Sequence, residues 1–223
     1  NISAIGAFNE RKFGANGFYA SPSAIDQYEE TQASIVGLST TYEKDKLIIK
    51  PKLYWKRNQD MYVYLRQDPS VYRNLHISNK VGVEVNASTP NNVGDLGIGF
   101  DLSKVSLSSN NLGDRDRTML NIFIEQKIDF QNEKIDLTPG VAITYFSDVS
   151  TRLNYQSNFF KNLFFYPGID LGYRVSQNLK FYSNIGYTYR IPTYTDLFYS
   201  SPTTLGNENL KLEKALTKEF GLK

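Results

Sequence analysis

His76 is the single histidine of this 223-residue chain and the one side chain that could serve as an imidazole base or metal ligand. It stands in NLHISN, with no second histidine and no carboxylate within a few residues, and the chain has no cysteine. Metal sites and nucleophile–base pairs both need partners at short range. The sequence therefore predicts a solvated histidine at the end of a loop, no metal site and no catalytic residue.

Two acidic clusters could offer oxygen ligands to a calcium ion. Asp114 and Asp116 occur in NNLGDRDR, and Glu29 and Glu30 occur in QYEET. Neither cluster has the spacing of a calcium-binding loop, and Arg115 and Arg117 offset the charge of the first. We expect solvated loop charge and no cofactor, with loop calcium as an alternative that the spacing does not support.

Aromatic residues gather in three polar segments, 12–30, 58–74 and 191–211. One interpretation is that these rings pack the loops together or lie at a membrane interface, where amphipathic rings are favoured. The other is that they line a binding vestibule, since ligand sites concentrate on loops and in barrel mouths. The candidate substrate-binding residues are Phe18, Tyr19, Tyr28, Tyr62, Tyr64, Tyr72, Tyr194, Phe198 and Tyr199.

The elements that would position these loops are long alternating segments. The clearest is NLKFYSNIGYTYR at 178–190, which predicts a strand with two different faces. Its apolar face, which would contact lipid in a membrane barrel, holds Leu179, Phe181, Ile185, Tyr187 and Tyr189. The opposite face of this strand and of the segment before it, which would line a polar lumen, holds Asp170, Arg174, Lys180, Tyr182, Asn184, Thr188 and Arg190. Charges at such positions suit a wide polar lumen better than a dry core.

The same alternation predicts about ten strands of roughly 11 to 15 residues, longer than the mode of soluble sheets. Further strands are expected near 1–11, 31–43, 46–57, 75–88, 94–108, 117–130, 133–147 and 212–223. The connections alternate between short ones, such as 89–94, and long ones, such as 58–74 and 191–211. In an up-and-down antiparallel sheet this parity places the short turns at one end and the long loops at the other, as in transmembrane β-barrels.

Composition leaves open whether the chain is soluble. The net charge is +2 and no basic run is present, so nucleic acid is not an expected partner. Mean hydropathy is −0.42, and no apolar run approaches the roughly 18 to 20 residues of a membrane-spanning helix. A β-barrel hides its apolar half in alternation, so a membrane barrel and a soluble β-sandwich binding module both remain possible; detergent dependence would separate them.

The end of the chain carries a family resemblance. RIPTYTDLFY at 190–199, followed by GNENLKLEKALTKEFGLK at 206–223, resembles a pattern of TonB-dependent outer-membrane receptors. Glu208 and Leu212 stand where that pattern usually has proline. The matching positions are Arg190, Pro192, Asp196, Leu197, Gly206, Asn207, Leu210, Lys211, Glu213, Glu219 and Gly221.

Segments 12–31 and 54–76 are similar to loops of the vitamin B12 (cobalamin) transporter branch of Bacteroidetes-type bacteria. The resemblance implies that residues 1–223 are an internal segment of one larger, 22-stranded barrel domain. This segment is expected to contain no plug domain, TonB box or signal peptide. It implies a bacterial outer-membrane location, contact with membrane lipid and the TonB complex, and active transport of a corrinoid. A surface lipoprotein is a possible further partner. The alternatives are a ferric siderophore or a glycan as cargo; an outer-membrane barrel enzyme is disfavoured because His76 has no evident partner.

Overall fold

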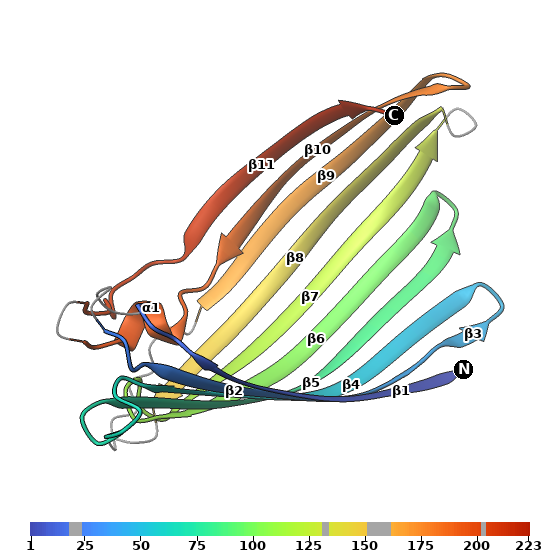
Figure 1. Ribbon diagram of the computed structural model, residues 1–223. Helices are drawn as coiled ribbons and strands as arrows, with labels where there is room; N and C mark the ends of the chain where they lie inside the picture. Colours follow the sequence, from blue (N-terminus) through green and yellow to red (C-terminus); the bar gives the residue numbers. More distant parts are fainter. Residues whose placement is uncertain (18–23, 131–133, 151–161, 202–203) are drawn as a thin grey trace.

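The computed structural model describes residues 1–17, 24–130, 134–150, 162–201 and 204–223, and these form one curved antiparallel sheet (Figure 1). The elements in chain order are β1 (Ile2–Gly14), β2 (Tyr28–Thr40), β3 (Tyr42–Lys44), β4 (Leu47–Val63), β5 (Arg73–Asn91), β6 (Gly94–Ser109), β7 (Arg115–Phe130), β8 (Ile135–Ser150), β9 (Asn162–Ser176), β10 (Leu179–Arg190), α1 (Tyr194–Phe198) and β11 (Glu213–Leu222).

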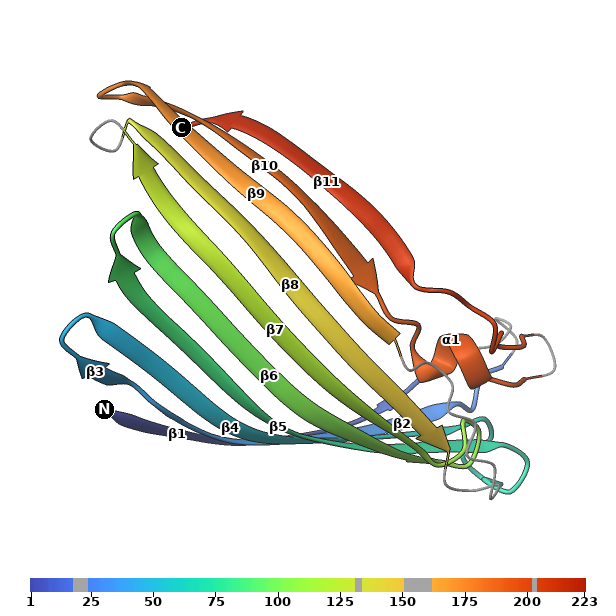
Figure 2. The same cartoon turned by 180° about the vertical axis from the view of Figure 1, so that it is seen from behind.

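Each long strand pairs with its neighbours in the sequence, in the order β1-β2-β4-β5-β6-β7-β8-β9-β10-β11, while β3 pairs only with β4. Seen from both sides, the sheet bends into an open trough whose two outer strands, β1 and β11, lie on opposite rims (Figures 1 and 2). Among the described strands β1 and β11 do not pair with each other. The predicted all-β, antiparallel up-and-down architecture is therefore confirmed as an open part of a larger barrel.

The ladder gives the sheet an apolar outer face, because residues paired directly across an antiparallel ladder point to the same side. Apolar pairs on this face include Leu102 with Leu120, Phe100 with Ile122, Ile98 with Ile124, Ile143 with Phe165 and Ile185 with Ile169. Side chains on this face are exposed in the structure: Phe165 is 55% exposed, and Leu163, two residues earlier on the same face of β9, is 57% exposed. An apolar band thus runs along the convex side of the trough.

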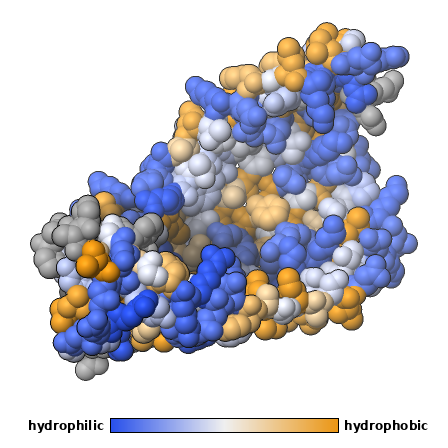
Figure 3. Space-filling view, in the orientation of Figure 1, coloured by the Kyte–Doolittle hydropathy of each residue, from blue (hydrophilic) through white to orange (hydrophobic). Residues whose placement is uncertain are grey.

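The opposite, inner face carries polar side chains that bond to one another across strands. The Tyr54 hydroxyl contacts Asp101, the Asn121 amide donates to the same carboxylate, and Thr144 donates to Asn121 at 2.6 Å. Nearer the other end of β4, Lys52 forms an ion pair with Glu84 at 2.9 Å. Figure 3 looks into the hollow and shows hydrophilic residues over much of it.

Glycines let large side chains lie flat on the inner face. The Tyr54 ring covers Gly82, where an added Cβ would come within 2.5 Å of the ring, and Phe123 covers Gly99 in the same way. A ring over a cross-strand glycine fills space that two full side chains would contest. The two rings therefore cover the inner wall at these glycines.

Several predicted boundaries are wrong. β4 continues to Val63 and β5 to Asn91, so the loop expected at 58–74 shrinks to 64–72 and the turn expected at 89–94 shrinks to Asn92–Val93. The alternation of the two faces continues through 58–63. It is not visible in the sequence there, because polar residues such as Gln59 occupy the outer face. The strand predicted at 31–43 is divided at Thr41 into β2 and β3. No helix among the described residues is long and apolar enough to cross a membrane.

Candidate functional site

The long connections lie together at one end of the sheet, here called the loop end (Figure 1). The amide of Arg66 donates to the carbonyl of Asp26 at 3.0 Å. The side-chain amide of Asn111 donates to the carbonyl of Ser200 at 2.8 Å, across 89 residues of sequence. The predicted sorting of long loops to one end is confirmed for the connections that the structure describes, and residues from four loops form one surface.

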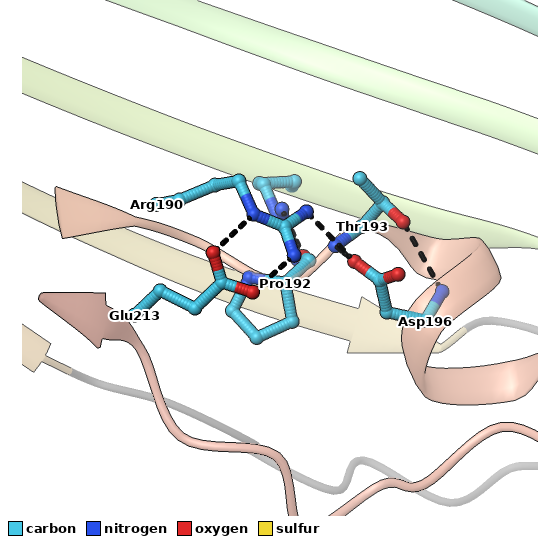
Figure 4. Close-up of polar contacts among 6 residues, drawn as sticks. Arg190, Pro192, Thr193, Asp196 and Glu213 are labelled. Atoms are coloured by element: carbon cyan, nitrogen blue, oxygen red, sulfur yellow. Dashed lines mark hydrogen bonds and ion pairs between the residues drawn. The ribbon is translucent and has the colours of Figure 1, made fainter.

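Arg190 fixes the start of the loop at 191–212 (Figure 4). Its guanidinium binds Glu213 on β11 through Nε at 2.8 Å and Nη2 at 2.5 Å, and binds Asp196 through Nη1 at 3.0 Å. One side chain thereby joins the last residue of β10, the first residue of β11 and helix α1. Planar two-point binding of a carboxylate is the geometry for which arginine is suited.

Asp196 also caps helix α1. Its carboxylate accepts from the Thr193 amide at 2.8 Å, while the Thr193 hydroxyl accepts from the Asp196 amide at 3.1 Å. This reciprocal capping box satisfies donors that a helix start leaves unpaired. The hydrogen bonds from Thr193, with the nearby Arg190, lower the pKa of Asp196 below its ordinary value of 3.8.

The loop then folds back on the helix. Leu197 is 2% exposed, and the Gly206 and Asn207 amides donate to the carbonyls of Tyr199 and Asp196 at 2.7 and 2.9 Å. A Cβ on Gly206 would lie 2.6 Å from the Leu197 carbonyl carbon, so only glycine fits. We call this arrangement of Arg190, Asp196, Leu197, Gly206 and Asn207 the clasp.

A buried ion pair holds the clasp against the sheet. Arg117 on β7 binds Asp148 on β8 through two contacts of 2.7 Å, and the side chains are 11% and 10% exposed. Its third nitrogen donates to the Pro192 carbonyl at 3.1 Å, and its guanidinium lies 4.8 Å from the centre of the Tyr194 ring. Burial raises the pKa of the Tyr194 phenol.

The 191–212 loop and the inner face of the sheet together line a pocket of about 160 Å³. Its lining residues are Arg117, Phe146, Phe164, Ile191, Pro192, Leu197, Leu210, Lys211 and Leu212. Pockets that hold drug-sized ligands measure roughly 300 to 1,000 Å³. This one is too small for such a ligand and belongs to the packing of the loop.

A tyrosine cluster occupies the other side of the loop end. Gln27, 1% exposed, donates to the Tyr62 hydroxyl at 2.5 Å, and Asn74 donates to the Tyr72 hydroxyl at 3.0 Å. The rings of Tyr62 and Tyr72 meet edge to face at 6.5 Å. Burial, and then the neighbouring Tyr72 hydroxyl, raise the pKa of the Tyr199 phenol. Tyrosines from β4, the 64–72 loop and the 191–212 loop thus lie close together.

Arginines stack on two further rings. The Arg66 guanidinium lies 4.5 Å from the centre of the Tyr28 ring, and that of Arg115 lies 3.4 Å from the centre of Phe198. In contacts of this kind the positive guanidinium is attracted to the face of the aromatic ring.

The structure shows where most of the aromatic residues predicted for the loops lie. Tyr28 and Tyr62 belong to strands β2 and β4 rather than to loops, which corrects the prediction. Tyr64 is the first residue after β4, and its amide donates to the Tyr72 carbonyl at 3.0 Å. Phe18 and Tyr19 lie outside the described residues. Most of the described rings contact other loop side chains, and their role in substrate binding stays a prediction.

The predicted solvated position of His76 is wrong. It lies in β5, half-buried, opposite Asp60 in the β4 ladder, and its Nδ1 is 2.7 Å from the Ser109 hydroxyl. Ser109 also accepts from the amides of Asn111 and Leu112 at 3.2 and 2.8 Å. His76 therefore supports the turn after β6. Its partners are remote in sequence, so a search of nearby residues could not find them.

The acidic clusters are divided by the strands. In β2 the successive residues Glu29 and Glu30 point to opposite faces; Glu30 approaches Lys12 at 3.6 Å. Asp116 forms an ion pair with Lys104 at 3.3 Å, and Asp114 accepts from Ser108. Loop calcium stays without a supporting observation.

The residues predicted for the lumen share the inner face. Lys180 forms an ion pair with Asp136 at 2.6 Å, Asn184 donates to Asp170, and Tyr182 covers Gly221. Tyr189 differs from its neighbours on the predicted lipid face, because its ring lies 4.5 Å from that of Tyr166. Tyr166 is paired with Ala142 and belongs to the inner face.

The sequence prediction missed Arg117, Asp148, Arg115 and Gln27. From sequence alone, Arg115 and Arg117 are expected only to offset the charge of the acidic cluster. Alternation at the start of a strand would have placed them on one face, but nothing local identifies Asp148, 31 residues away, as the partner of Arg117.

Comparison with solved structures shows the same fold at low sequence identity. The siderophore receptor PirA from Pseudomonas aeruginosa matches with a TM-score of 0.76 and 12% identity, over 99% of this chain and 39% of that one. The FrpB iron transporter from Neisseria meningitidis matches with a TM-score of 0.75 and 14% identity, over 99% and 40%. The copper transporter OprC matches with a TM-score of 0.69 and 14% identity, over 98% and 42%.

The chain thus spans about two fifths of the length of these structures. Comparison with curated proteins finds no significant match. The family model described as "TonB dependent receptor-like, beta-barrel" matches residues 4–223. Members of that family are transporters of the Gram-negative outer membrane, not enzymes. The chain belongs to the TonB-dependent receptor-like β-barrel family.

Proposed function

We propose that this chain forms part of the barrel of a receptor that imports a scarce nutrient across the outer membrane, driven through TonB. The observation that carries the proposal is that the two faces of one sheet differ. One face is apolar and exposed, and the other carries polar side chains that hydrogen-bond across strands. The long loops lie together at one end of this sheet. A soluble sandwich would bury such an apolar face against a second sheet.

The outer face supports a membrane boundary near the loop end. Toward the loops its apolar residues give way to polar ones: Arg57 donates to Gln59 at 2.9 Å, and Lys104 pairs with Asp116. In β6 the outer positions Ile98, Phe100 and Leu102 precede Lys104. We assign the apolar band to lipid and the loop end to the external side, by the pattern of bacterial barrels.

For the cargo we propose a metal-containing small molecule, with a corrinoid first and a ferric siderophore second. The similarity of 12–31 and 54–76 to cobalamin-transporter loops supports the corrinoid. The structural neighbours, which include a siderophore receptor and iron and copper transporters, support a metal complex more generally. TonB, acting through a plug domain, and a surface lipoprotein are proposed as partners.

The test uses the full-length receptor, purified in detergent. Isothermal titration with cyanocobalamin and with a panel of ferric siderophores should give saturable binding for one class. Uptake of the same labelled ligand into cells should require an intact TonB. Absence of any corrinoid binding would end the corrinoid assignment, and uptake that persists without TonB would contradict the mechanism.

A further inference from the structure

Two lysines face each other on the inner wall without a carboxylate between them. Lys56 of β4 and Lys80 of β5 are direct partners in the ladder. Both share the face of the Lys52–Glu84 ion pair, since all four residues occupy alternate positions of the same two strands. Like charges directly opposite each other destabilise a sheet.

The positions around this pair offer no compensating charge. Ile35 faces Lys56 from β2, and Val105 faces Lys80 from β6. The neighbours on the same face along the two strands are Tyr54, Asn58, Ser78 and Gly82. No carboxylate of the described residues forms an ion pair with Lys56 or Lys80.

The wall compensates the charge of one lysine in part. The Lys80 ammonium lies 5.5 Å from the centre of the Tyr54 ring, while Lys56 is exposed toward the hollow. The nearby pair of Lys52 and Glu84 shows that the same strands neutralise a lysine elsewhere. The absence of a neutralising carboxylate is therefore specific to Lys56 and Lys80 and is not shared by the lysine nearest to them on the same face of β4.

We infer that Lys56 and Lys80 form an anion site that receives an oxyanion group, a carboxylate in the first instance, of a small ligand inside the barrel. Two lysines paired across the ladder can both donate to one such group, and the exposed Asn58, the next residue of β4 on the same face, offers a further donor. The inference rests on the proposed import function and adds that the cargo presents an oxyanion, a carboxylate in a carboxylate-bearing siderophore or the phosphodiester in a corrinoid.

The full-length receptor, with its lysines ¹³C-methylated so that they keep their charge, can be titrated with citrate at constant ionic strength. The signals of Lys56 and Lys80 should shift saturably, whereas that of Lys52 should not. The double substitution Lys56→Gln with Lys80→Gln should weaken citrate binding at least tenfold. Lys52→Gln, on the same strand and face, is the matched control and should leave the affinity unchanged.

Equal shifts at all three lysines, or an affinity that the double substitution leaves unchanged, would overturn the anion site. A photo-crosslinker at position 56 that joins another part of the protein's own chain would also overturn it, because the charge would then be satisfied internally. A second titration with inorganic phosphate tests which oxyanion the site accepts. Binding of phosphate but not of citrate would overturn the carboxylate assignment and identify the ligand group as a phosphate.

Uptake assays keep this result separate from the proposed function. If cells import a corrinoid or ferric siderophore while citrate fails to bind, the anion site is wrong and the import function stands. If citrate binds at Lys56 and Lys80 but no nutrient is taken up, the site stands and the import function fails.

Discussion

At the scale of the residue, the family marker has a structural explanation. Arg190 joins Glu213 to Asp196, Asp196 caps α1, and Gly206 admits the carbonyl of Leu197. These side chains bond to one another and to backbone, so the motif holds the loop in place. Ligand contact is not needed to explain why these residue types stand at this spacing.

Thr193→Ala tests the cap. Loss of the hydroxyl that accepts from the Asp196 amide should cost about 1 kcal/mol locally. Hydrogen exchange of the amides in α1 should then quicken about fivefold, while the melting temperature of the whole receptor changes little. Thr195→Ala, in the same helix, is the control; equal acceleration in both variants would show that the capping bond is not responsible.

Asp196 should make the clasp sensitive to acid. Because the pKa of this carboxyl in the folded protein lies below 3.8, its contribution is present above pH 3.8 and is lost as the pH falls through the folded value. Exchange at the Thr193 amide, normalised to the intrinsic rate, should rise on acidification below about pH 4. Asp196→Asn should remove this dependence; an unchanged pH profile in that variant would refute the assignment.

At the scale of the element, the buried ion pair decides how firmly the 191–212 loop sits on the sheet. Arg117 of β7 binds Asp148, its direct partner on the adjacent strand β8, and also donates to the Pro192 carbonyl. The loop is thereby fixed at one point to the sheet wall and at another, through Arg190, to both flanking strands. It forms a fixed part of the loop end.

A double-mutant cycle tests this anchoring. Arg117→Met alone should cost about 3 to 5 kcal/mol, since it leaves the buried Asp148 carboxylate uncompensated. Arg117→Met combined with Asp148→Leu should cost less than the sum of the single substitutions. Urea unfolding of the full-length receptor in lipid vesicles measures both; additive costs would mean that the pair contributes no coupling.

At the scale of the whole molecule, the two faces assign the sheet to a membrane wall, and adjacent residues can test this. Ile124 lies on the outer face, 43% exposed, and Glu125 lies on the inner face. In a bilayer Ile124→Lys should cost about 2 to 4 kcal/mol of folding free energy, while Glu125→Lys should cost little. Urea unfolding in lipid vesicles compares them; equal costs would contradict the lipid assignment.

The sequence by itself determined the repeated two-residue alternation, the up-and-down sheet and the sorting of loops to one end, because these depend on local period and connection length. It also located the clasp, whose marker residues lie within 190–213. Boundaries such as the end of β4 at Val63 escaped it, since polar residues appear on the outer face where the strand leaves the apolar band.

Tertiary structure alone decided the partners. Whether His76 is solvated or bonded to Ser109, whether Arg117 meets Asp148, and whether Lys56 faces another lysine all depend on the register between strands. Register depends on pairing along the whole length of each strand and on the neighbouring strands. The partners in these contacts are 24 to 33 positions apart in sequence, so a pattern within one strand cannot identify them.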